Sequence, residues 1–429
     1  MAARLNNQDS EFETKFQALL SAKRESAADV NQAVSEIISN VRTNGDAALY
    51  ELTERFDHLD LKDKGLAISG DEIEAAIKEV PSETMQALEL AAERIESHHK
   101  KQKPDDQRYT DDLGVELGYR WSPVTAAGLY VPGGTASYPS SVLMNAIPAK
   151  VAGVERLVMV VPTPNDVTNP LVLAAAKLAG IKEIYRIGGA QAIAALTYGT
   201  ETISPVDKIV GPGNAYVAAA KRQVFGTVGI DMIAGPSEVL IIADKNNNPD
   251  WIAADLLAQA EHDVAAQSIL ITDSVELANE VEKAVEAQLK TLPRGEIAGK
   301  AWQDFGAIIL VDDLQKAASL SDRLAPEHLE LALDDPESMF EKIKHAGAVF
   351  IGHHTPEAIG DYVGGSNHVL PTARSARFSS GLNVLDFMKK TTILKCSAEG
   401  LRALGPAAIT LAEAEGLGAH ARSVSIRMN

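Results

Sequence analysis

The side chains of this sequence best suited to hold a metal ion are a glutamine, an aspartate and three histidines. Gln259 and His262 stand three positions apart in the segment QAEH, on one face of a predicted helix. Asp361 and His368 fall in a glycine-rich stretch, and His420 closes the predicted C-terminal helix. Because the sequence has a single cysteine, a zinc ion would need nitrogen and oxygen ligands, which these groups supply.

Each of these residues also has a structural interpretation. A lone histidine on a helix usually serves packing, Asp361 could form a turn, and His420 could cap its helix. Acidic and histidine side chains in glycine-rich loops have fewer structural roles. Taken together, the residues support a metal site about as well as they support the structural alternative.

An adjacent glutamate and histidine form a second chemical feature, in the segment PEHLEL at 326–331. Glu327 offers a carboxylate and His328 an imidazole, and both can move protons near neutral pH once their surroundings shift a pKa. The alternative is a turn at a helix end with two solvated side chains. Spacing alone leaves both interpretations open.

Glycine clusters follow predicted strands, at the positions where α/β sheets bind ligands. They occupy 132–135, 188–191, 211–214 and 364–367. The third of them begins like a dinucleotide fingerprint, but Tyr216 stands where the third glycine belongs, and no P-loop motif is present. Each cluster alone indicates a turn, whereas three at the strand ends of one unit favour a nucleotide-like ligand.

The elements that must position these residues alternate between strands and helices, which predicts an α/β fold with mostly parallel sheets. The predicted strands are 126–131, 157–161, 184–187 and 209–210 in a first unit, and 239–243, 269–272, 308–311 and 349–352 in a second. We divide the chain into an N-terminal helical region, two α/β units and a helical tail, at 1–123, 124–236, 237–381 and 382–429. Which unit the N-terminal helices cover is open, and we place them on the second.

Composition narrows the class of protein. The net charge of −19, from 40 basic and 59 acidic residues, opposes nucleic-acid binding, and the basic run at 98–103 is short. No stretch of about 18 apolar residues predicts a membrane span, and the first residues do not resemble a signal peptide. The lone Cys396, expected to be a small buried side chain, favours a reducing cytoplasm.

Several uninterrupted motifs, read in order, resemble the histidinol dehydrogenase family over nearly the whole chain. They are GLYVPGGT (128–135), IGGAQA (187–192), VGPGNAYV (210–217), DMIAGPSE (231–238), QAEH (259–262), APEHLE (325–330) and GDYVGGSNH (360–368). The resemblance implies a four-electron oxidation of L-histidinol to L-histidine through L-histidinaldehyde, with NAD as co-substrate. It also implies two tandem incomplete Rossmann-like units and a homodimer with shared active sites, whose C-terminal helical tails are exchanged between subunits.

The family's functional positions can be carried over residue by residue, and we find no departure from its pattern. One zinc ion per subunit would be held by Gln259, His262, Asp361 and His420 of the partner subunit, while Glu327 and His328 would be the acid–base pair. The substrate-contacting positions are Ser237, Gln259, His262, His328, Asp361, His368, Glu415 and His420. The NAD-contacting positions are Tyr130, Gln191 and Asn214.

Three other functions are weighed against this one. A dehydrogenase of the same fold acting on another primary alcohol, such as a sulfonated diol, would keep Glu327 and His328 but change the substrate contacts. Glu415 and His420 match the histidinol pattern instead. A zinc hydrolase would have no use for the NAD positions, and a metal-binding assembly protein would leave the acid–base pair without a purpose.

Overall fold

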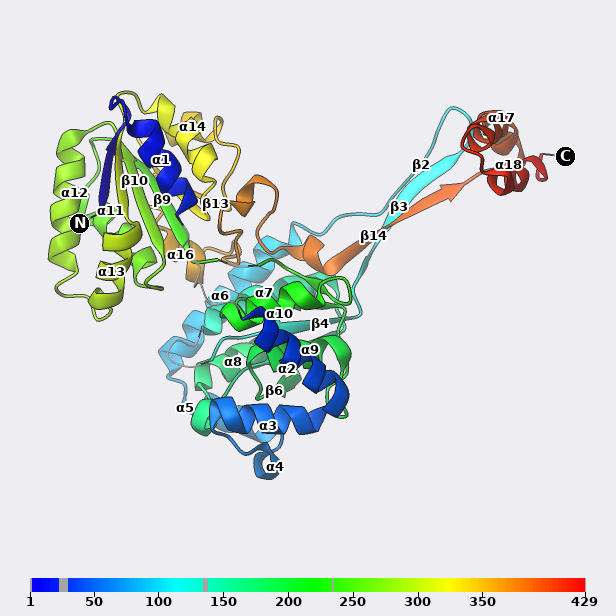
Figure 1. Cartoon of the computed structure of the whole chain (residues 1–429), viewed down its shortest axis with the longest axis horizontal. Helices are drawn as coiled ribbons and strands as arrows, with labels where there is room; N and C mark the ends of the chain where they lie inside the picture. The colour runs from blue at the N-terminus through cyan, green and yellow to red at the C-terminus, as the bar shows by residue number, and fades with distance from the viewer. Residues whose placement is uncertain (1, 23–29, 134–137, 234, 429) are drawn as a thin grey trace.

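The computed structural model describes residues 2–22, 30–133, 138–233 and 235–428. Figure 1 shows two α/β bodies joined side by side and a long arm that projects from them and ends in two helices. Residues 134, 135 and 234 of the glycine-containing motifs lie outside the described residues. Among the helices that the structure describes, none combines the length and apolar character needed to cross a bilayer.

The first sheet is parallel throughout and has the strand order β6-β5-β4-β7-β8. Its strands are β4 (Ala126–Tyr130), β5 (Arg156–Val160), β6 (Glu183–Tyr185), β7 (Lys208–Val210) and β8 (Gly229–Ile230). Its own helices are α7 (Pro139–Ala152), α8 (Pro170–Ala179), α9 (Gly189–Tyr198) and α10 (Ala215–Val224). Helix α7 was not predicted, because it is buried on nearly all sides and so lacks the apolar stripe that marks a surface helix.

The second sheet is also parallel, with the order β1-β11-β10-β9-β12-β13. Its strands are β1 (Ala3–Asn6), β9 (Glu238–Ala243), β10 (Gln267–Thr272), β11 (Ala307–Leu310), β12 (His328–Ala332) and β13 (Ala348–Ile351). Its helices are α1 (Phe12–Ser21), α11 (Pro249–Ala260), α12 (Val275–Gln288), α13 (Gly295–Phe305), α14 (Gln315–Leu324), α15 (Pro336–Phe340) and α16 (Glu357–Tyr362). Strand β12 is a correction: the segment that could have been a solvated turn is a buried strand between β9 and β13.

The helices that follow α1 pack on the first sheet, so their expected place on the second unit was wrong. They are α2 (Asn31–Asn44), α3 (Asp46–Asp57), α4 (Leu61–Lys64), α5 (Gly70–Glu79) and α6 (Ser82–Lys100). Val34, Ile38 and Val41 of α2 join the core formed with α9 and α10, and α6 lies against α7. Of the N-terminal residues that the structure describes, only those of β1 and α1 join the second sheet. An apolar stripe shows that a helix is covered, but not by which neighbour.

The arm is an antiparallel sheet that carries the C-terminal helices away from both α/β bodies (Figure 1). It consists of β2 (Gln107–Thr110), β3 (Glu116–Pro123) and β14 (Met388–Lys395), followed by α17 (Ala398–Ala414) and α18 (Gly418–Ser425). Leu411 and Ile426 on its helices are more than half exposed. His420 lies in the first turn of α18 and does not close a helix, and Cys396 is exposed, contrary to expectation.

Candidate active site

A cavity of about 1540 Å³ is lined by residues from both sheets. From the first sheet it receives the loop 211–214, which follows the carboxyl end of β7. From the second it receives Glu238 and His328, which are the first residues of β9 and β12. Parallel sheets usually bind ligands at the carboxyl ends of their strands. The second sheet therefore contributes to this cavity with its opposite, amino-terminal edge.

Most of the residues predicted for the site line this one cavity. They are Asn214, Ser237, Gln259, His262, Glu327, His328, Asp361 and His368. Tyr130 and Gln191 are buried in the first unit and are not among the described residues that line it. Glu415 and His420 are exposed on the helices at the far end of the arm (Figure 1), so within one chain they do not reach the cavity.

His328 is held in one tautomer at the floor of the cavity. Its Nδ1 lies 3.0 Å from the carbonyl oxygen of Glu238, and because a carbonyl only accepts, this nitrogen carries the proton. Its Nε2 is buried, has no hydrogen-bond partner among the described residues, and lies 3.9 Å from Asp361 Oδ1. Burial lowers the pKa of His328, and the nearby Asp361 charge opposes that shift. Nε2 is therefore placed to accept a proton.

Glu327 precedes His328 and is buried beside it. Its Oε2 accepts a hydrogen bond from the backbone N–H of Glu238 at 2.9 Å and lies 3.7 Å from His328 Nδ1. The carboxylate and the imidazole are thus both fixed by the first residue of β9. Two groups that exchange protons at neighbouring positions in one cavity suit a reaction with separate proton-transfer steps.

Gln259 lies in the last turn of α11, and His262 lies in the turn just beyond that helix. In its hydrogen-bonded orientation the Gln259 amide donates to Glu357 Oε1 at 2.7 Å, and its oxygen accepts from the N–H of Glu238 at 2.8 Å. His262 is exposed to the cavity. An amide oxygen and an imidazole therefore lie on the same wall.

Glu357 is a functional candidate that the sequence reasoning missed. It is fully buried, and its Oε2 lies 3.6 Å from His328 Nδ1 with no hydrogen-bond partner among the described residues. Burial, together with the charges of Asp361 and Glu330, raises the pKa of Glu357 well above its usual value. Its spacing of four residues from Asp361, on one face of α16, is the signal that could have identified it.

His368 connects the two α/β bodies within the cavity. Its Nδ1 donates to the carbonyl oxygen of Asp361 at 3.0 Å, and its Nε2 lies 3.1 Å from Ser141 Oγ on α7 of the first unit. Since Nδ1 holds the ring proton, the Ser141 hydroxyl donates to Nε2. Burial lowers the pKa of His368. The imidazole is thus fixed at both nitrogens.

The donors around the cavity fit a zinc ion with nitrogen and oxygen ligands. Gln259, His262 and Asp361 supply an amide oxygen, an imidazole and a carboxylate, and the exposed Cys396 on the arm offers no thiolate. The buried Nε2 of His328, left without a partner, marks where a ligand would approach. One chain supplies three of the four donors that the family resemblance implies, because His420 is remote.

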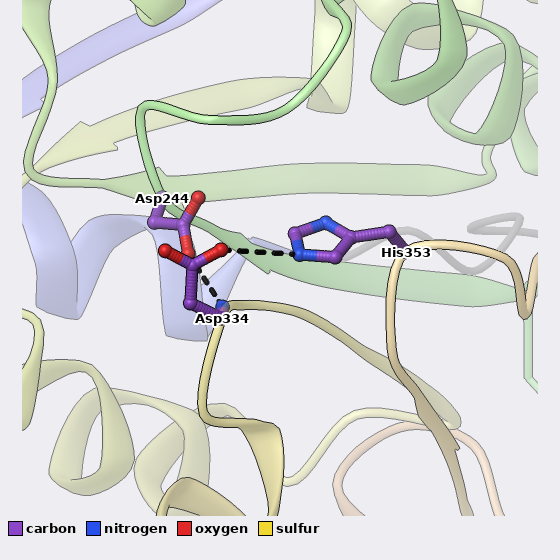
Figure 2. Close-up of side chains that lie close together, drawn as sticks. All are labelled: Asp244, Asp334 and His353. Carbon is purple, nitrogen blue, oxygen red and sulfur yellow. Dashed lines mark hydrogen bonds and ion pairs between the residues drawn. The ribbon is translucent and has the colours of Figure 1, made fainter.

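A second group of donor side chains lies at the opposite edge of the second sheet (Figure 2). Asp244, Asp334 and His353 follow the carboxyl ends of β9, β12 and β13, with donor atoms within 4.8 Å of one another. Contacts among the three residues account for their proximity, because Asp244 Oδ2 accepts from the N–H of Asp334 at 2.7 Å and His353 Nε2 lies 3.6 Å from Asp334 Oδ1 (Figure 2). We assign no ion to it.

The glycine loop at 211–214 is held from beneath by a buried ion pair. Asp231 accepts a hydrogen bond from Gly211 N–H at 2.8 Å, and Lys221 Nζ donates to the Gly211 carbonyl at 3.0 Å and to Asp231. Gly211 has a φ of +113°, and a Cβ there would lie 2.1 Å from the carbonyl oxygen of Tyr130. Only glycine fits this position, because any side chain would collide with the backbone of β4.

The helix that follows this loop begins at the cavity. Asn214 caps α10 by accepting hydrogen bonds from the N–H groups of Tyr216 and Val217, at 3.0 and 3.2 Å. The adjacent helix α9 begins at Gly189, whose N–H donates to Tyr130 Oη at 3.1 Å. Burial raises the pKa of Tyr130 to about 12, so its hydroxyl stays protonated. Two helix N-termini at this edge favour a negatively charged ligand such as a dinucleotide.

Comparisons with known proteins agree over the full length of the chain. The family model described as histidinol dehydrogenase matches residues 20–428. A histidinol dehydrogenase of Rhizobium meliloti (strain 1021) is 67% identical over 429 residues, which cover 100% of this chain and 99% of the relative. One of Brucella abortus (strain 2308) is 66% identical, with 100% of both chains covered. The crystal structure of histidinol dehydrogenase from Elizabethkingia anophelis superposes with a TM-score of 0.95 at 40% identity, covering 100% of this chain and 98% of that one.

Proposed function

The chain belongs to the histidinol dehydrogenase family, and on that premise we propose how its cavity carries out the reaction. It is an oxidoreductase that oxidises L-histidinol to L-histidine in histidine biosynthesis. We assign NAD as the co-substrate that accepts a hydride in each of two steps, with L-histidinaldehyde held between them. The alternative, oxidation of a sulfonated diol, is not favoured by identities of 66–67% to histidinol dehydrogenases over the whole chain.

In the first step His328 acts as the base. Its neutral Nε2 accepts the proton of the primary alcohol while hydride passes from the carbinol carbon to the first NAD, which leaves an aldehyde. The fixed tautomer supports this role, because the proton on Nδ1 is bound to the Glu238 carbonyl and the free lone pair is on Nε2. Burial lowers the pKa of His328, which favours the neutral imidazole before the transfer.

In the second step Glu327 activates water. The carboxylate removes a proton from water as the oxygen attacks the aldehyde carbon. His328 returns the proton taken from the alcohol to the former carbonyl oxygen, so the product is the hydrate and the imidazole is a base again. His328 then accepts a hydrate proton while hydride passes to a second NAD, which yields the carboxylic acid. Because the two hydride transfers are alike, one NAD site serves both. Asn214, and Tyr130 and Gln191 behind it, are our candidates for that site.

Zinc would be held by Gln259, His262, Asp361 and His420 of the partner subunit. Bound there, the ion would act as a Lewis acid and orient the imidazole and amine nitrogens of the substrate. Ser237 and His368 line the same cavity and are our candidates for contacting the substrate directly. The fully buried Glu357 would orient the amide of Gln259 through its hydrogen bond.

A homodimer with exchanged arms would complete each site. In one chain Glu415 and His420 lie far from the cavity, on helices with exposed apolar side chains such as Leu411 and Ile426. Two helices at the end of a narrow three-stranded sheet have little core of their own, so a second chain is the natural cover for this surface. We place the reaction in the cytoplasm, where the single thiol would stay reduced.

The observation that best supports this proposal is the fixed tautomer of His328. Its imidazole lies beside Glu327, inside the cavity that both sheets share. Its test is NADH formation at 340 nm with L-histidinol, before and after treatment with a chelator. We expect two NADH per histidinol, loss of the reaction on chelation, and recovery with zinc. A metal-replete protein that forms no NADH from histidinol would contradict the proposal.

A further inference from the structure

The loop 363–367 lies between Asp361, a proposed zinc ligand, and His368, a proposed substrate contact. Its own contacts are with a helix from the other α/β body. Arg94, on α6, donates from Nε to the carbonyl oxygen of Val363 at 2.5 Å and from Nη2 to that of Gly364 at 3.0 Å. Val363 is the C-cap residue of α16, and Gly364 follows it. The guanidinium therefore caps α16 from outside its own unit.

The far end of the same loop is held by α6 as well. His99 is fully buried, and its Nδ1 donates to the carbonyl of Ile95 at 2.7 Å. Its Nε2 is consequently the acceptor for Asn367 Nδ2, at 3.4 Å. Asn367 also donates to the Met144 carbonyl of α7 at 2.7 Å. The residue next to His368 is thus tied to the core of the first unit.

Close packing leaves this loop little freedom. Gly365 has a φ of +102°, and a Cβ at that position would lie 3.0 Å from the backbone oxygen of Arg94. Val363 packs against the apolar core of the first unit. Both ends and the middle of the loop therefore contact α6 or its neighbours, while Asp361 and His368, on either side of it, face the cavity.

We propose that Arg94 is a positioning residue that sets the places of Asp361 and His368 by fixing the end of α16 to the first unit. The inference rests on the proposed roles of those two residues. Arg94 itself does not line the cavity, so its effect passes through the backbone that it holds. Charge-assisted bonds to carbonyls are stronger than neutral ones, and both guanidinium donors act on consecutive residues.

The test compares Arg94→Met, Arg94→Lys and a control on the same helix, Lys100→Met, which removes only an exposed pair with Glu96. In Arg94→Met we expect amide hydrogen exchange over 360–369 to accelerate about tenfold, because the loop loses two strong bonds. The affinity of the metal-free protein for zinc, measured by chelator competition, should fall. The KM for histidinol should rise about tenfold, with the KM for NAD within about twofold of wild type. Arg94→Lys should restore part of each value, and the control should match wild type.

A second variant displaces the loop without touching the arginine. Gly365→Ala should produce the same pattern, because its methyl group would push the loop off α6. Unchanged exchange over 360–369 in Arg94→Met would overturn the inference, as would an equal loss in the histidinol and NAD parameters with a lowered melting temperature. A wild-type protein that fails to oxidise histidinol would refute the proposed function alone, because hydrogen exchange would still decide whether Arg94 fixes the loop.

Discussion

His328 and Glu238 begin neighbouring strands, and the imidazole Nδ1 of one lies 3.0 Å from the carbonyl oxygen of the other. The pairing of β12 with β9 thereby fixes which ring nitrogen is basic. Since the contact uses a backbone atom, it depends on strand register and not on a second side chain. The proposed base is therefore oriented by the sheet itself.

The first prediction concerns pH. Burial lowers the pKa of His328, so the base is neutral above that pKa and becomes protonated as the pH falls through it. We expect kcat/KM for histidinol to drop only below the usual histidine range, and His328→Asn to slow both half-reactions while removing this acidic limb. The pH profiles of the two proteins check this. Full activity in His328→Asn would exclude His328 as the base.

The second prediction separates the two half-reactions. Glu327→Gln keeps an acceptor for the Glu238 N–H but loses the charge that activates water. Oxidation of L-histidinaldehyde should fall by about 10²–10⁴-fold, as for the loss of a general base, and the alcohol step should fall much less. Single-turnover assays started from L-histidinol and from L-histidinaldehyde measure the rates of the two half-reactions separately. Equal losses would remove the water-activating role, and the exposed Glu341→Gln serves as the control.

The third prediction concerns the ion pair beneath the glycine loop. Asp231→Asn leaves the Lys221 ammonium buried without a counter-charge, so the free energy of unfolding should fall by about 3–5 kcal/mol. Replacing both residues by Met and Leu should recover much of that stability but still raise the KM for NAD, because Gly211 loses its partners. Denaturant titration and NAD kinetics test the pair. As a control, Asp312→Asn breaks the exposed ion pair with Lys316. It should change neither the free energy of unfolding nor the KM for NAD.

The fourth prediction tests whether sites are shared between chains. A heterodimer of His262→Ala and His420→Ala subunits would contain one site with both histidines and one with neither. Co-expression of the two variants with different tags, followed by purification through both, should recover activity that each homodimer lacks. Absence of any recovery would mean that each site is built within one chain.

Local sequence patterns predicted those elements of the fold whose structure depends mainly on residues close together in the chain. The strands predicted at 126–131, 239–243 and 269–272 correspond to β4, β9 and β10, and the loop at Gly211 precedes a helix. Eight predicted site residues line one cavity, because strand ends and the loops beside them gather at sheet edges. The resemblance, not spacing, identified most of their roles.

Other features depend on contacts that no local pattern records. Strand β12 begins at His328, directly after Glu327, and these two polar residues made the segment resemble a turn although the strand lies inside the sheet. This polar start lines the cavity, so the apolar pattern expected of a buried strand is interrupted there. The arm joins β3 to β14 across more than half the chain, and strand pairs so distant leave no turn signal.

The two sheets meet with opposite polarity, since the first offers its carboxyl edge to the cavity and the second its amino edge. The loops that contain Asp244 and Asp334 consequently do not line the cavity. In most parallel sheets, loops like these at the carboxyl ends of the strands form the active site. Insertions there would lengthen the chain without disturbing the cavity or the arm. This rim is therefore where a fluorescent label or affinity tag can be attached to a working enzyme.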